Sequence, residues 1–515
     1  MRIPHPKGSL ALAGLAVVLL VLGSPNRWLH LYPAALIGIS PLLLLSWNLP
    51  FWSQVRWSFG VWFIFCAFVF LPDLFSVKVL EAWEILGGIA IAPIVPLFYV
   101  TATVLSLALT RVVPLWIRPL AIATVWTGLD GILGLVWFPI PFHWGSLLYD
   151  WPLGIQIADL TGIWGVTFVA VLMNATLAAL ATLMRQRRNG FRDPRVWRAQ
   201  IAMTGGVGLG VWSLVLGYGL IRLDMYSHLT DPFFMVAAVQ PVAWFDAASP
   251  YTQEYRTQRY QELLALSQKG VEQGAELIIW PEGALRGRLQ NTPLEPYLLA
   301  GLKQILPPTG AWITGAAEPD PRDVHAPDQS KKFNNSALLY DATGQFQDRY
   351  GKQWLFPYFE TQRYIPPPDS YRPLKGDRFG QLGLMICLES VLPNASRNLV
   401  DAGAQLLIAI SDDIWFGNSN WPHLHGILSV FRAIENRRSF VFVNNTGGNL
   451  IVDPSGRIQQ QGEIFQQGVV VGKIFVREEI TVYQIWGDYL IRVTGLITLC
   501  LGFIALTNRR TYGLD

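Results

Sequence analysis

The chain has 515 residues, of which 51% are hydrophobic and 15% are charged, and its formal net charge is +3. Soluble proteins carry roughly a quarter charged residues, so this composition excludes an ordinary soluble protein. The small net charge gives no reason to expect a nucleic acid as a partner.

The charged residues are unevenly distributed along the chain. Residues 1–225 are almost continuously apolar, residues 226–486 have the charges and turns of a soluble domain, and a last apolar stretch runs to about Thr507. We therefore predict a membrane bundle of about seven helices at 1–225 and a water-exposed domain at 226–486. A last membrane helix with a short cytoplasmic tail is predicted at 487–515.

Apolar segments long enough to cross a bilayer recur in chain order. A membrane-spanning helix needs about 20 apolar residues. The first segment alone could be a signal peptide, but its many apolar successors favour a first span. Pro93 and Pro96 predict a tilt or break in the fourth. The segments together predict an α-helical transmembrane bundle of about eight spans, at 8–25, 30–48, 55–73, 84–110, 115–136, 157–184, 200–222 and 488–507.

Basic residues between these segments predict the orientation. Arg2 and Lys7 precede the first span, six arginines within 185–198 follow the sixth, and Arg509 and Arg510 follow the last. With eight spans all of them face one side, which the positive-inside rule makes cytoplasmic. The domain at 226–486 then lies on the opposite, extracytoplasmic side. A count that differs by one would reverse this orientation.

The water-exposed domain alternates between β-rich runs and helix-like stretches. Helices are predicted at Thr252–Gln273 and His423–Arg438. This alternation is typical of a layered α/β domain. Strands are predicted at Phe233–Val239, Leu277–Trp280, Trp312–Gly315, Ser336–Tyr340, Leu382–Cys387, Leu406–Ser411, Phe440–Asn444 and Val469–Ile474.

Three residues with reactive side chains stand where a predicted strand meets a loop. Glu282 follows the strand that ends in Trp-Pro, Lys352 precedes a run of aromatic residues, and Cys387 ends a buried strand. Taken singly, each has a simpler interpretation: a solvated carboxylate, a surface lysine and a packed core cysteine. Together they are the parts needed for acyl transfer through a thioester, because a thiol needs a base, a thiolate is stabilised by a cation, and the intermediate needs oxyanion donors.

The segments around these residues resemble the Glu–Lys–Cys signature of the nitrilase superfamily, whose domains are αββα sandwiches. A domain of this kind between the seventh and eighth spans resembles the apolipoprotein N-acyltransferase family, and the resemblance extends over nearly the whole chain. Further segments that resemble that family are Ile155–Gly165, Ser411–Gly417, His425 with Phe431–Glu435, and Asn445–Gly447.

The resemblance implies a role for each of these side chains. Glu282 is then the general base, Lys352 the oxyanion-stabilising lysine and Cys387 the nucleophile. Glu360 and Glu389 match carboxylates that support the lysine and the thiol, and Trp415 matches an aromatic residue near the acyl site. Positions that depart from the family pattern are Leu388, Phe359, Phe442 and Val443.

The resemblance also implies the reaction. An acyl chain passes from a phospholipid donor through a cysteine thioester to the N-terminal amine of a diacylglyceryl apolipoprotein, with no cofactor. The alternatives from the residues alone are a membrane-tethered amidase that uses water as the acceptor and a non-catalytic lipid-binding scaffold.

Three smaller features have interpretations of their own. The aromatic run Trp354–Phe359 is either core packing behind the lysine or an apolar lid at the lipid interface. His423 and His425 have a spacing that suggests a metal site, but no third ligand accompanies them, so we expect no metal. His143 and Trp144 are expected to anchor the bundle at the membrane interface.

Overall fold

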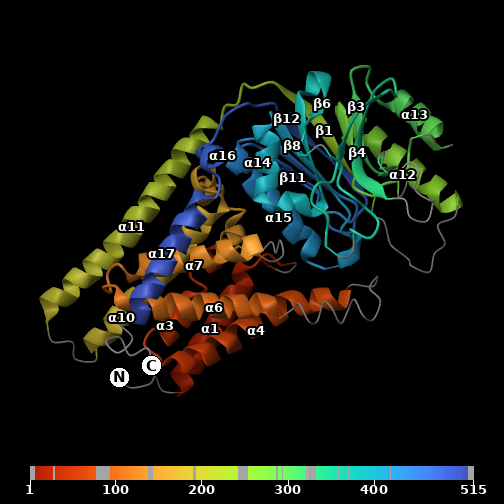
Figure 1. The fold of residues 1–515 in the computed structure, drawn as a ribbon. Helices are drawn as coiled ribbons and strands as arrows, with labels where there is room; N and C mark the ends of the chain where they lie inside the picture. The colour runs from red at the N-terminus through yellow and green to blue at the C-terminus, as the bar shows by residue number, and fades with distance from the viewer. Residues whose placement is uncertain are drawn as a thin grey trace. The chain divides into compact units, whose positions relative to one another are not determined.

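The structure is a computed structural model that describes residues 6–26, 29–76, 93–136, 143–188, 193–241, 253–285, 288–290, 292, 294–320, 322, 332–357, 360–368, 370–417 and 419–507. The chain forms two compact units (Figure 1). One is an α/β unit built around Met225–Gly487, and the other is a helical unit built from the chain before and after it.

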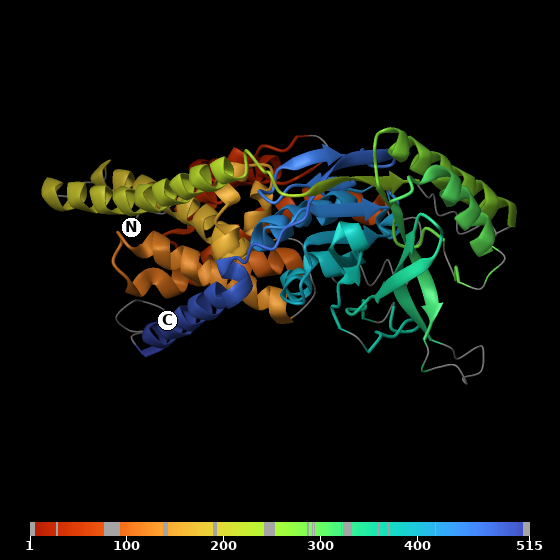
Figure 2. The ribbon, with the colours of Figure 1, turned by 90° about the horizontal axis from the view of Figure 1, so that it is seen from above.

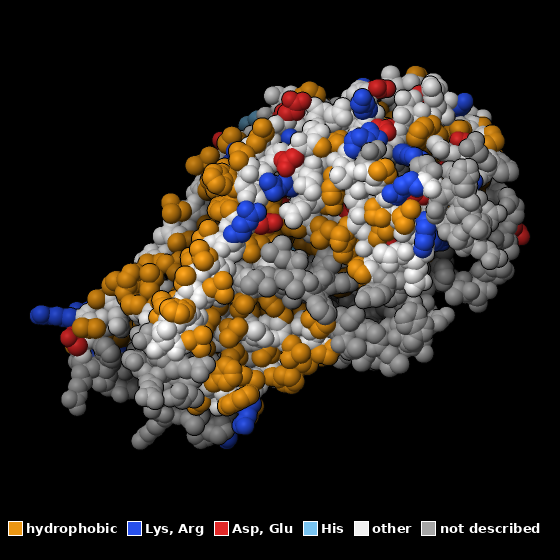
Figure 3. Space-filling model, in the orientation of Figure 1, with side chains coloured by type: hydrophobic (Ala, Val, Ile, Leu, Met, Phe, Trp, Pro, Cys, Tyr) orange, Lys and Arg blue, Asp and Glu red, His pale blue; other side chains and the backbone are white. Residues whose placement is uncertain are grey.

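Four helices of the helical unit, within the described part of the chain, are long and apolar enough to cross a membrane. They are Ile94–Val112, Ile163–Arg188, Pro194–Met225 and Tyr489–Thr507. Hydrophobic side chains cover the surface along α11 and α17 (Figure 3), and Leu214 on α11 is 75% exposed. Apolar side chains that face outward on this scale suit a lipid environment, because water would oppose their exposure.

The remaining elements of the helical unit are shorter or only partly described. The helices of this unit are α1 (Pro6–Gly23), α2 (Tyr32–Ala35), α3 (Ser40–Ser46), α4 (Phe51–Ser76), α6 (Ile94–Leu109), α7 (Arg118–Val136), α8 (Pro152–Ile155), α9 (Ala158–Thr161), α10 (Ile163–Arg188), α11 (Pro194–Met225) and α17 (Tyr489–Thr507), with the 3-10 turns η1 (Thr110–Val112) and η2 (Trp144–Leu148).

Several predicted spans differ from the helices in the structure. The predicted span 30–48 is not one helix, because a turn separates α2 from α3. The predicted span 157–184 begins later, at Ile163, because Gly162 takes a positive φ of 67° between α9 and α10. Residues 84–92 of the fourth predicted span lie outside the described residues, and α6 starts directly after Pro93. The count of eight spans therefore stays a prediction.

The α/β unit contains two six-stranded sheets. In the first sheet the strand order is β12-β1-β2-β3-β4-β5, and in the second it is β11-β10-β9-β8-β7-β6. The strands are β1 (Phe233–Gln240), β2 (Leu277–Ile279), β3 (Ala311–Pro319), β4 (Phe333–Asp341), β5 (Phe346–Gly351), β6 (Leu374–Lys375), β7 (Gln381–Ile386), β8 (Leu406–Ser411), β9 (Phe440–Asn444), β10 (Leu450–Val452), β11 (Ile458–Gln461) and β12 (Gly468–Phe475). All eight predicted strands are present, which confirms the α/β prediction.

Each sheet is built around three parallel strands joined by helices. In the first sheet β1, β2 and β3 are parallel, and α12 (Gln253–Glu272) and α13 (Leu294–Ile305) connect them. In the second, β7, β8 and β9 are parallel, and α14 (Pro393–Asp401) and α15 (Trp421–Asn436) connect them. Parallel strands need such crossovers, and the helices cover one face of each sheet.

The two sheets pack against each other between the helix pairs, which gives the predicted αββα layers (Figures 1 and 2). The core under α12 and α13 includes Trp280, Trp312 and Tyr340, which are fully buried and in ring contact. The strand interiors are just as apolar, and β8 is buried at all six positions. The polar residues of the unit are therefore brought together where buried strands end.

Candidate active site

Cys387 lies at the carboxyl end of β7, in a strained turn. Its φ is +56°, and the chain passes from the extended Ile386 directly into the 3-10 turn η6 (Cys387–Val391). A left-handed conformation at a residue with a Cβ costs on the order of 1–3 kcal/mol, so it persists only where the surroundings hold it. The turn directs the half-buried thiol out of the strand end.

Glu282 follows β2 and is held by two hydrogen bonds. Asn335 Nδ2 donates to Oε1 at 2.6 Å, and the backbone N–H of Asp412 donates to Oε2 at 3.0 Å. The neighbouring strand β3 passes so close that a Cβ on Gly315 would lie 2.7 Å from the Glu282 Cα, so a glycine is required there. These contacts leave Glu282 only 8% exposed.

Lys352 directly follows β5 and lies between two carboxylates. Its Nζ donates to Glu360 Oε1 at 2.7 Å and lies 3.9 Å from Glu282 Oε1. Its backbone N–H donates to the Asn335 carbonyl at 2.8 Å, so Asn335 contacts both the lysine and the glutamate. The lysine is 1% exposed. The two carboxylates compensate the charge of the buried ammonium group, which offsets the cost of burying it.

The protonation of these groups follows from burial and from their mutual charges. Burial raises the pKa of Glu282 to about 7, although Lys352 acts in the opposite direction. Burial alone would lower the pKa of Lys352, but negative charge that develops on Cys387, Glu282 or Glu360 raises it, so the lysine stays protonated. Burial also raises the pKa of the Cys387 thiol, with Lys352 opposing. The resting thiol is therefore protonated and needs a base, and a carboxylate whose pKa is near 7 is suited to that task.

Glu389 connects the lysine loop to the nucleophile turn. Its carboxylate accepts hydrogen bonds from the backbone N–H groups of Gln353, Trp354 and Ile386, and from the hydroxyl of Tyr350. It is fully buried, and burial raises its pKa against the effect of these backbone N–H groups. Because its partners precede Cys387 on one side and follow Lys352 on the other, Glu389 fixes the two loops relative to each other.

The two other predicted supporting residues differ in how far the structure describes them. Glu360 accepts from Lys352 Nζ and, through Oε2, from the backbone N–H of Phe356 at 2.8 Å, so it orients the lysine directly. Trp415 lies on the 3-10 turn η7 (Ile414–Phe416) after β8, but its side chain is outside the described residues. The structure therefore brings Glu282, Lys352, Glu360, Cys387 and Glu389 together, and the roles of these residues and of Trp415 stay predictions.

A second buried chain of hydrogen bonds, which was not predicted from the sequence, lies behind the nucleophile turn. His425 Nδ1 lies 3.0 Å from Asp413 Oδ2, and its Nε2 lies 3.0 Å from Ser390 Oγ and 3.3 Å from the Cys387 carbonyl oxygen. Asn444 Nδ2 also donates to Asp413 at 2.7 Å. The Ser390 hydroxyl donates to the same Cys387 carbonyl at 2.9 Å. One indication of this chain is visible in the sequence: Asp413 lies just after the carboxyl end of β8, and Asn444 lies at the carboxyl end of β9.

The aromatic run beside the lysine fits neither simple interpretation completely. Trp354 and Phe356 are half-buried, whereas residues 358 and 359 lie outside the described part of the chain.

The histidine spacing at 423 and 425 does not correspond to a metal site in the described residues. His425 Nδ1 lies 3.0 Å from Asp413 Oδ2, a carboxylate just after β8. Among the described residues, no group of three or more His, Cys, Asp or Glu side chains could hold a metal ion.

Comparison with known proteins places these observations in a family. The carbon-nitrogen hydrolase family model matches residues 235–479, and the model of the apolipoprotein N-acyltransferase N-terminal domain matches residues 15–176. A curated relative from Geobacter metallireducens, named apolipoprotein N-acyltransferase, is 29% identical over 94% of this chain and 92% of its own length. A relative of the same name from Azotobacter vinelandii is 26% identical over 98% of this chain and 96% of its own. The chain belongs to the apolipoprotein N-acyltransferase family.

Among solved structures, an amidase from Nesterenkonia sp. aligns with 48% of this chain and 91% of its own at 20% identity and a TM-score of 0.37.

The positions at which this chain departs from the apolipoprotein N-acyltransferase pattern are mostly core positions. Leu388 is 4% exposed, Phe442 and Val443 are fully buried, and the Phe442 ring contacts His425 edge-on at 4.9 Å between centroids. Phe359 lies outside the described residues.

Proposed function

We propose that this protein transfers an acyl chain from a phospholipid to the free N-terminal amine of the diacylglyceryl-cysteine of apolipoproteins, through a thioester on Cys387. The observation that carries the proposal is that one chain matches both family models, so a thiol hydrolase-type site is joined to apolar helices. The relatives that match nearly the whole chain are named for N-acylation.

In the first half-reaction, ionised Glu282 takes the proton from Cys387 Sγ, and the thiolate attacks the ester carbonyl of the phospholipid. The oxyanion of the tetrahedral intermediate is stabilised by Lys352 Nζ and by the backbone N–H after Cys387. When the intermediate collapses, the carbon–oxygen bond breaks and protonated Glu282 returns the proton to the leaving alkoxide. The products are a lysophospholipid and an acyl-enzyme.

In the second half-reaction, the lipoprotein amine attacks the thioester carbonyl. Glu282 accepts the proton that the amine loses, the carbon–sulfur bond breaks, and the thiolate takes that proton back. Lys352 again faces the oxyanion. Glu360 keeps the lysine in place, Glu389 keeps the two loops in register, and Trp415 borders the acyl chain.

The proposed reaction explains why the active-site domain is joined to apolar helices. Both substrates carry acyl chains, and moving such chains into water would cost about 0.8 kcal/mol per CH₂ group. A site at the bilayer surface avoids that transfer. We place the protein in the cell inner membrane with about eight spans, and its domain at 226–486 on the periplasmic side.

The first test detects the intermediate. Purified protein is mixed with phospholipid vesicles, and the Cys387 peptide is analysed by mass spectrometry. We expect the mass of one long acyl chain on Cys387, its removal by a diacylglyceryl lipopeptide, and N-acylation of that lipopeptide. Cys387→Ala should show neither product, whereas Cys500→Ser, at an exposed thiol on α17, should show both.

Two outcomes would contradict the proposal. N-acylation that persists in Cys387→Ala would exclude the thioester route. An acyl-enzyme that is discharged only by water, with no transfer to the lipopeptide amine, would favour the membrane-tethered amidase.

A further inference from the structure

The peptide group between Cys387 and Leu388 is held through its carbonyl oxygen. The Ser390 hydroxyl donates to the Cys387 carbonyl at 2.9 Å, and His425 Nε2 lies 3.3 Å from the same oxygen. Among the described residues, none accepts a hydrogen bond from the Leu388 N–H, which belongs to the same peptide group. The carbonyl and the N–H of a trans peptide are coplanar and point in opposite directions. Contacts that fix this carbonyl therefore also fix the direction of the Leu388 N–H.

The unpaired N–H is itself informative. Leu388 is buried, and most buried backbone N–H groups in folded proteins have an acceptor. An N–H that follows the nucleophile directly and has no acceptor among the described residues is available to a group of the substrate.

Ser390 and His425 are fixed in turn by buried contacts. Ser390 Oγ lies 3.0 Å from His425 Nε2, and both side chains are buried. On the other side of the imidazole ring, His425 Nδ1 lies 3.0 Å from Asp413 Oδ2. Asp413 also accepts from Ser411 Oγ at 2.8 Å and from Asn444 Nδ2 at 2.7 Å. The chain joins η6 and α15 to the carboxyl ends of β8 and β9, so the Ser390 hydroxyl cannot turn away without disrupting a buried network.

A simpler interpretation of Ser390 is a local turn contact. A serine hydroxyl often donates to a carbonyl three or four residues earlier, as Ser429 on α15 does to the Gly426 carbonyl at 2.6 Å. Two observations go beyond such a contact. The carbonyl that Ser390 contacts has a second polar neighbour in His425, which is 35 residues later in the chain. The N–H of that same peptide group has no acceptor in the described part of the chain.

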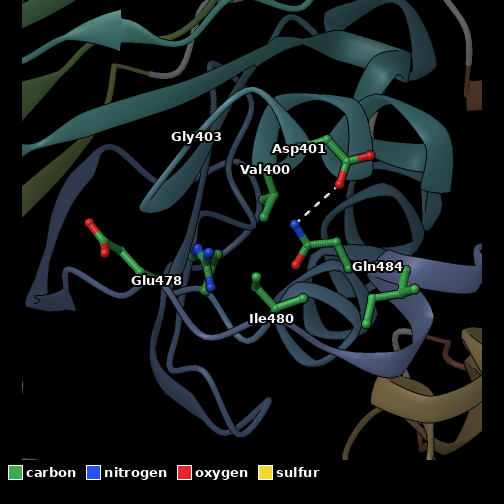
Figure 4. A pocket seen from close by; sticks show the side chains of 8 residues that line it. Val400, Asp401, Gly403, Glu478, Ile480 and Gln484 are labelled. Atoms are coloured by element: carbon green, nitrogen blue, oxygen red, sulfur yellow. Dashed lines mark hydrogen bonds between the residues drawn. The ribbon is translucent and has the colours of Figure 1, made fainter.

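The pocket at the opposite end of the second sheet differs from the nucleophile turn. It lies at the amino end of β9, where Arg438 lines it (Figure 4). Arg438 donates to the Glu479 carbonyl at 2.7 Å, and Asp401 accepts from Gln484 at 3.2 Å, as the dashed line in Figure 4 shows. These polar groups already have protein partners, whereas the Leu388 N–H is left for a substrate.

We propose that Ser390 and His425 are positioning residues of the oxyanion site. They hold the Cys387 carbonyl so that the Leu388 N–H points at the oxygen of the tetrahedral intermediate. This inference rests on the proposed function, in which that N–H is one of two oxyanion donors. The hydrogen bond from Ser390 also polarises the peptide group, which makes its N–H a stronger donor. Donors that are oriented in advance stabilise the charge that develops in the transition state without having to move.

The test compares two reactions of the Cys387 thiol. Acylation by a p-nitrophenyl ester of a fatty acid passes through an oxyanion, whereas alkylation by iodoacetamide does not. For Ser390→Ala we expect the rate constant of acylation at saturating ester, followed as the p-nitrophenolate burst, to fall at least tenfold. The half-saturating ester concentration should stay within twofold of the parent value. The alkylation rate should not change, because Ser390 is neutral and does not alter the ionisation of the thiol.

Ser429→Ala is the matched control. It also removes a buried hydroxyl that donates to the carbonyl three residues earlier, but in the middle of α15. Both reactions of Cys387 should proceed in this variant at the parent rates.

Equal fractional losses of acylation and alkylation in Ser390→Ala would overturn the proposal, because they would show a displaced thiol and not a weakened oxyanion donor. Acylation of Ser390→Ala at the parent rate would also overturn it. Neither outcome touches the proposed function, since the parent protein would still form the acyl-enzyme. A parent protein without a burst would contradict the proposed thioester and this inference with it.

Discussion

The two ends of the parallel strands in the second sheet hold their charged side chains in different ways. At the carboxyl ends, Glu282, Lys352 and Cys387 change one another's protonation through direct charge interactions. At the amino ends, Arg438 is held chiefly by backbone carbonyls, which do not titrate. Groups that shift one another's pKa can pass a proton, whereas a charge fixed by backbone carbonyls can only bind. The chemistry is therefore expected at the carboxyl ends of these strands.

The largest effect should come from removing the shared cation. Lys352→Met takes away an oxyanion donor, which is typically worth about 3 kcal/mol, so the rate of acyl-enzyme formation should fall at least a hundredfold. It also leaves Glu282 and Glu360 buried without their partner, and the free energy of unfolding should drop by about 3–5 kcal/mol. Stopped-flow acylation and denaturant unfolding measure the two losses. Lys269→Met, at an exposed position on α12, is the control, and equal losses in both variants would refute the assignment.

The pH dependence should report Glu282. The base must be ionised, and because its pKa is raised to about 7, the rate of acyl-enzyme formation should fall as the pH drops through 7, to about a tenth of its maximum at pH 6. The sign for stability is the opposite: the raised pKa favours the folded state fully below pH 4.5, and this contribution is lost as the pH rises through 7. A rate that is flat between pH 6 and pH 8 would exclude Glu282 as the base.

A smaller effect is expected from the hydrogen-bond chain behind the nucleophile turn. His425→Asn removes the contacts to Asp413 and to the Cys387 carbonyl that help to hold the strained turn. Loss of a buried hydrogen bond costs about 1–3 kcal/mol, so we expect a ten- to hundredfold lower kcat with an unchanged KM. The alkylation rate of Cys387 by iodoacetamide, measured against pH, should shift in parallel. His423→Asn, two residues earlier on α15, is the matched control, and an equal effect of both would contradict a positioning role.

The smallest effect should appear at the amino ends of the strands. Tyr226 is 5% exposed, and the guanidinium groups of Arg437 and Arg477 lie 4.8 and 5.0 Å from its ring centroid. Each such contact is worth about 0.5–1 kcal/mol, so Tyr226→Leu should lower the free energy of unfolding by about 1–2 kcal/mol. The alkylation rate of Cys387 should not change. A change in that rate would show that the two ends of the sheet are coupled.

Seven of the eight strands predicted from sequence are mostly buried, whereas β12 lies at a sheet edge and alternates between buried and partly exposed positions. β8 and β9 are buried at every position, so their apolar runs are visible in the sequence. Four strands were not predicted. β5, β6 and β11 lie at sheet edges, and β11 carries the polar residues Gln459–Gln461, whereas β10 is buried but only three residues long. Edge strands lose less by facing water, and their sequences therefore resemble loops.

From the residue pattern alone, the candidate site was predictable only in its reactive groups, and Glu360 and Glu389 were predicted only through the family resemblance. Glu282 and Cys387 are visible because each interrupts an apolar run where a strand ends, and Lys352 is visible because it precedes a run of aromatic residues. Asn335 was not singled out, although it contacts both Glu282 and the Lys352 loop, because its role depends on β4 lying beside β3 and β5. The roles assigned to the three reactive groups stay predictions until the variants are measured. In the membrane unit, hydropathy located apolar segments but could not show the interruption at Gly162, since a single glycine hardly changes a long average.

The pairing of β1 with β12 has a consequence for biosynthesis. Phe233 pairs with Phe475, so one edge of the first strand of the α/β unit stays unpaired until the last strand has been synthesised. At ordinary rates of synthesis, about 5–20 residues per second, that wait is on the order of 10–50 s. An unpaired strand edge is prone to aggregation, so the nascent unit needs protection through almost its whole synthesis. Truncation before Gly468 should yield a chain that is degraded, whereas removal of the residues after Thr507 should leave the unit free to fold.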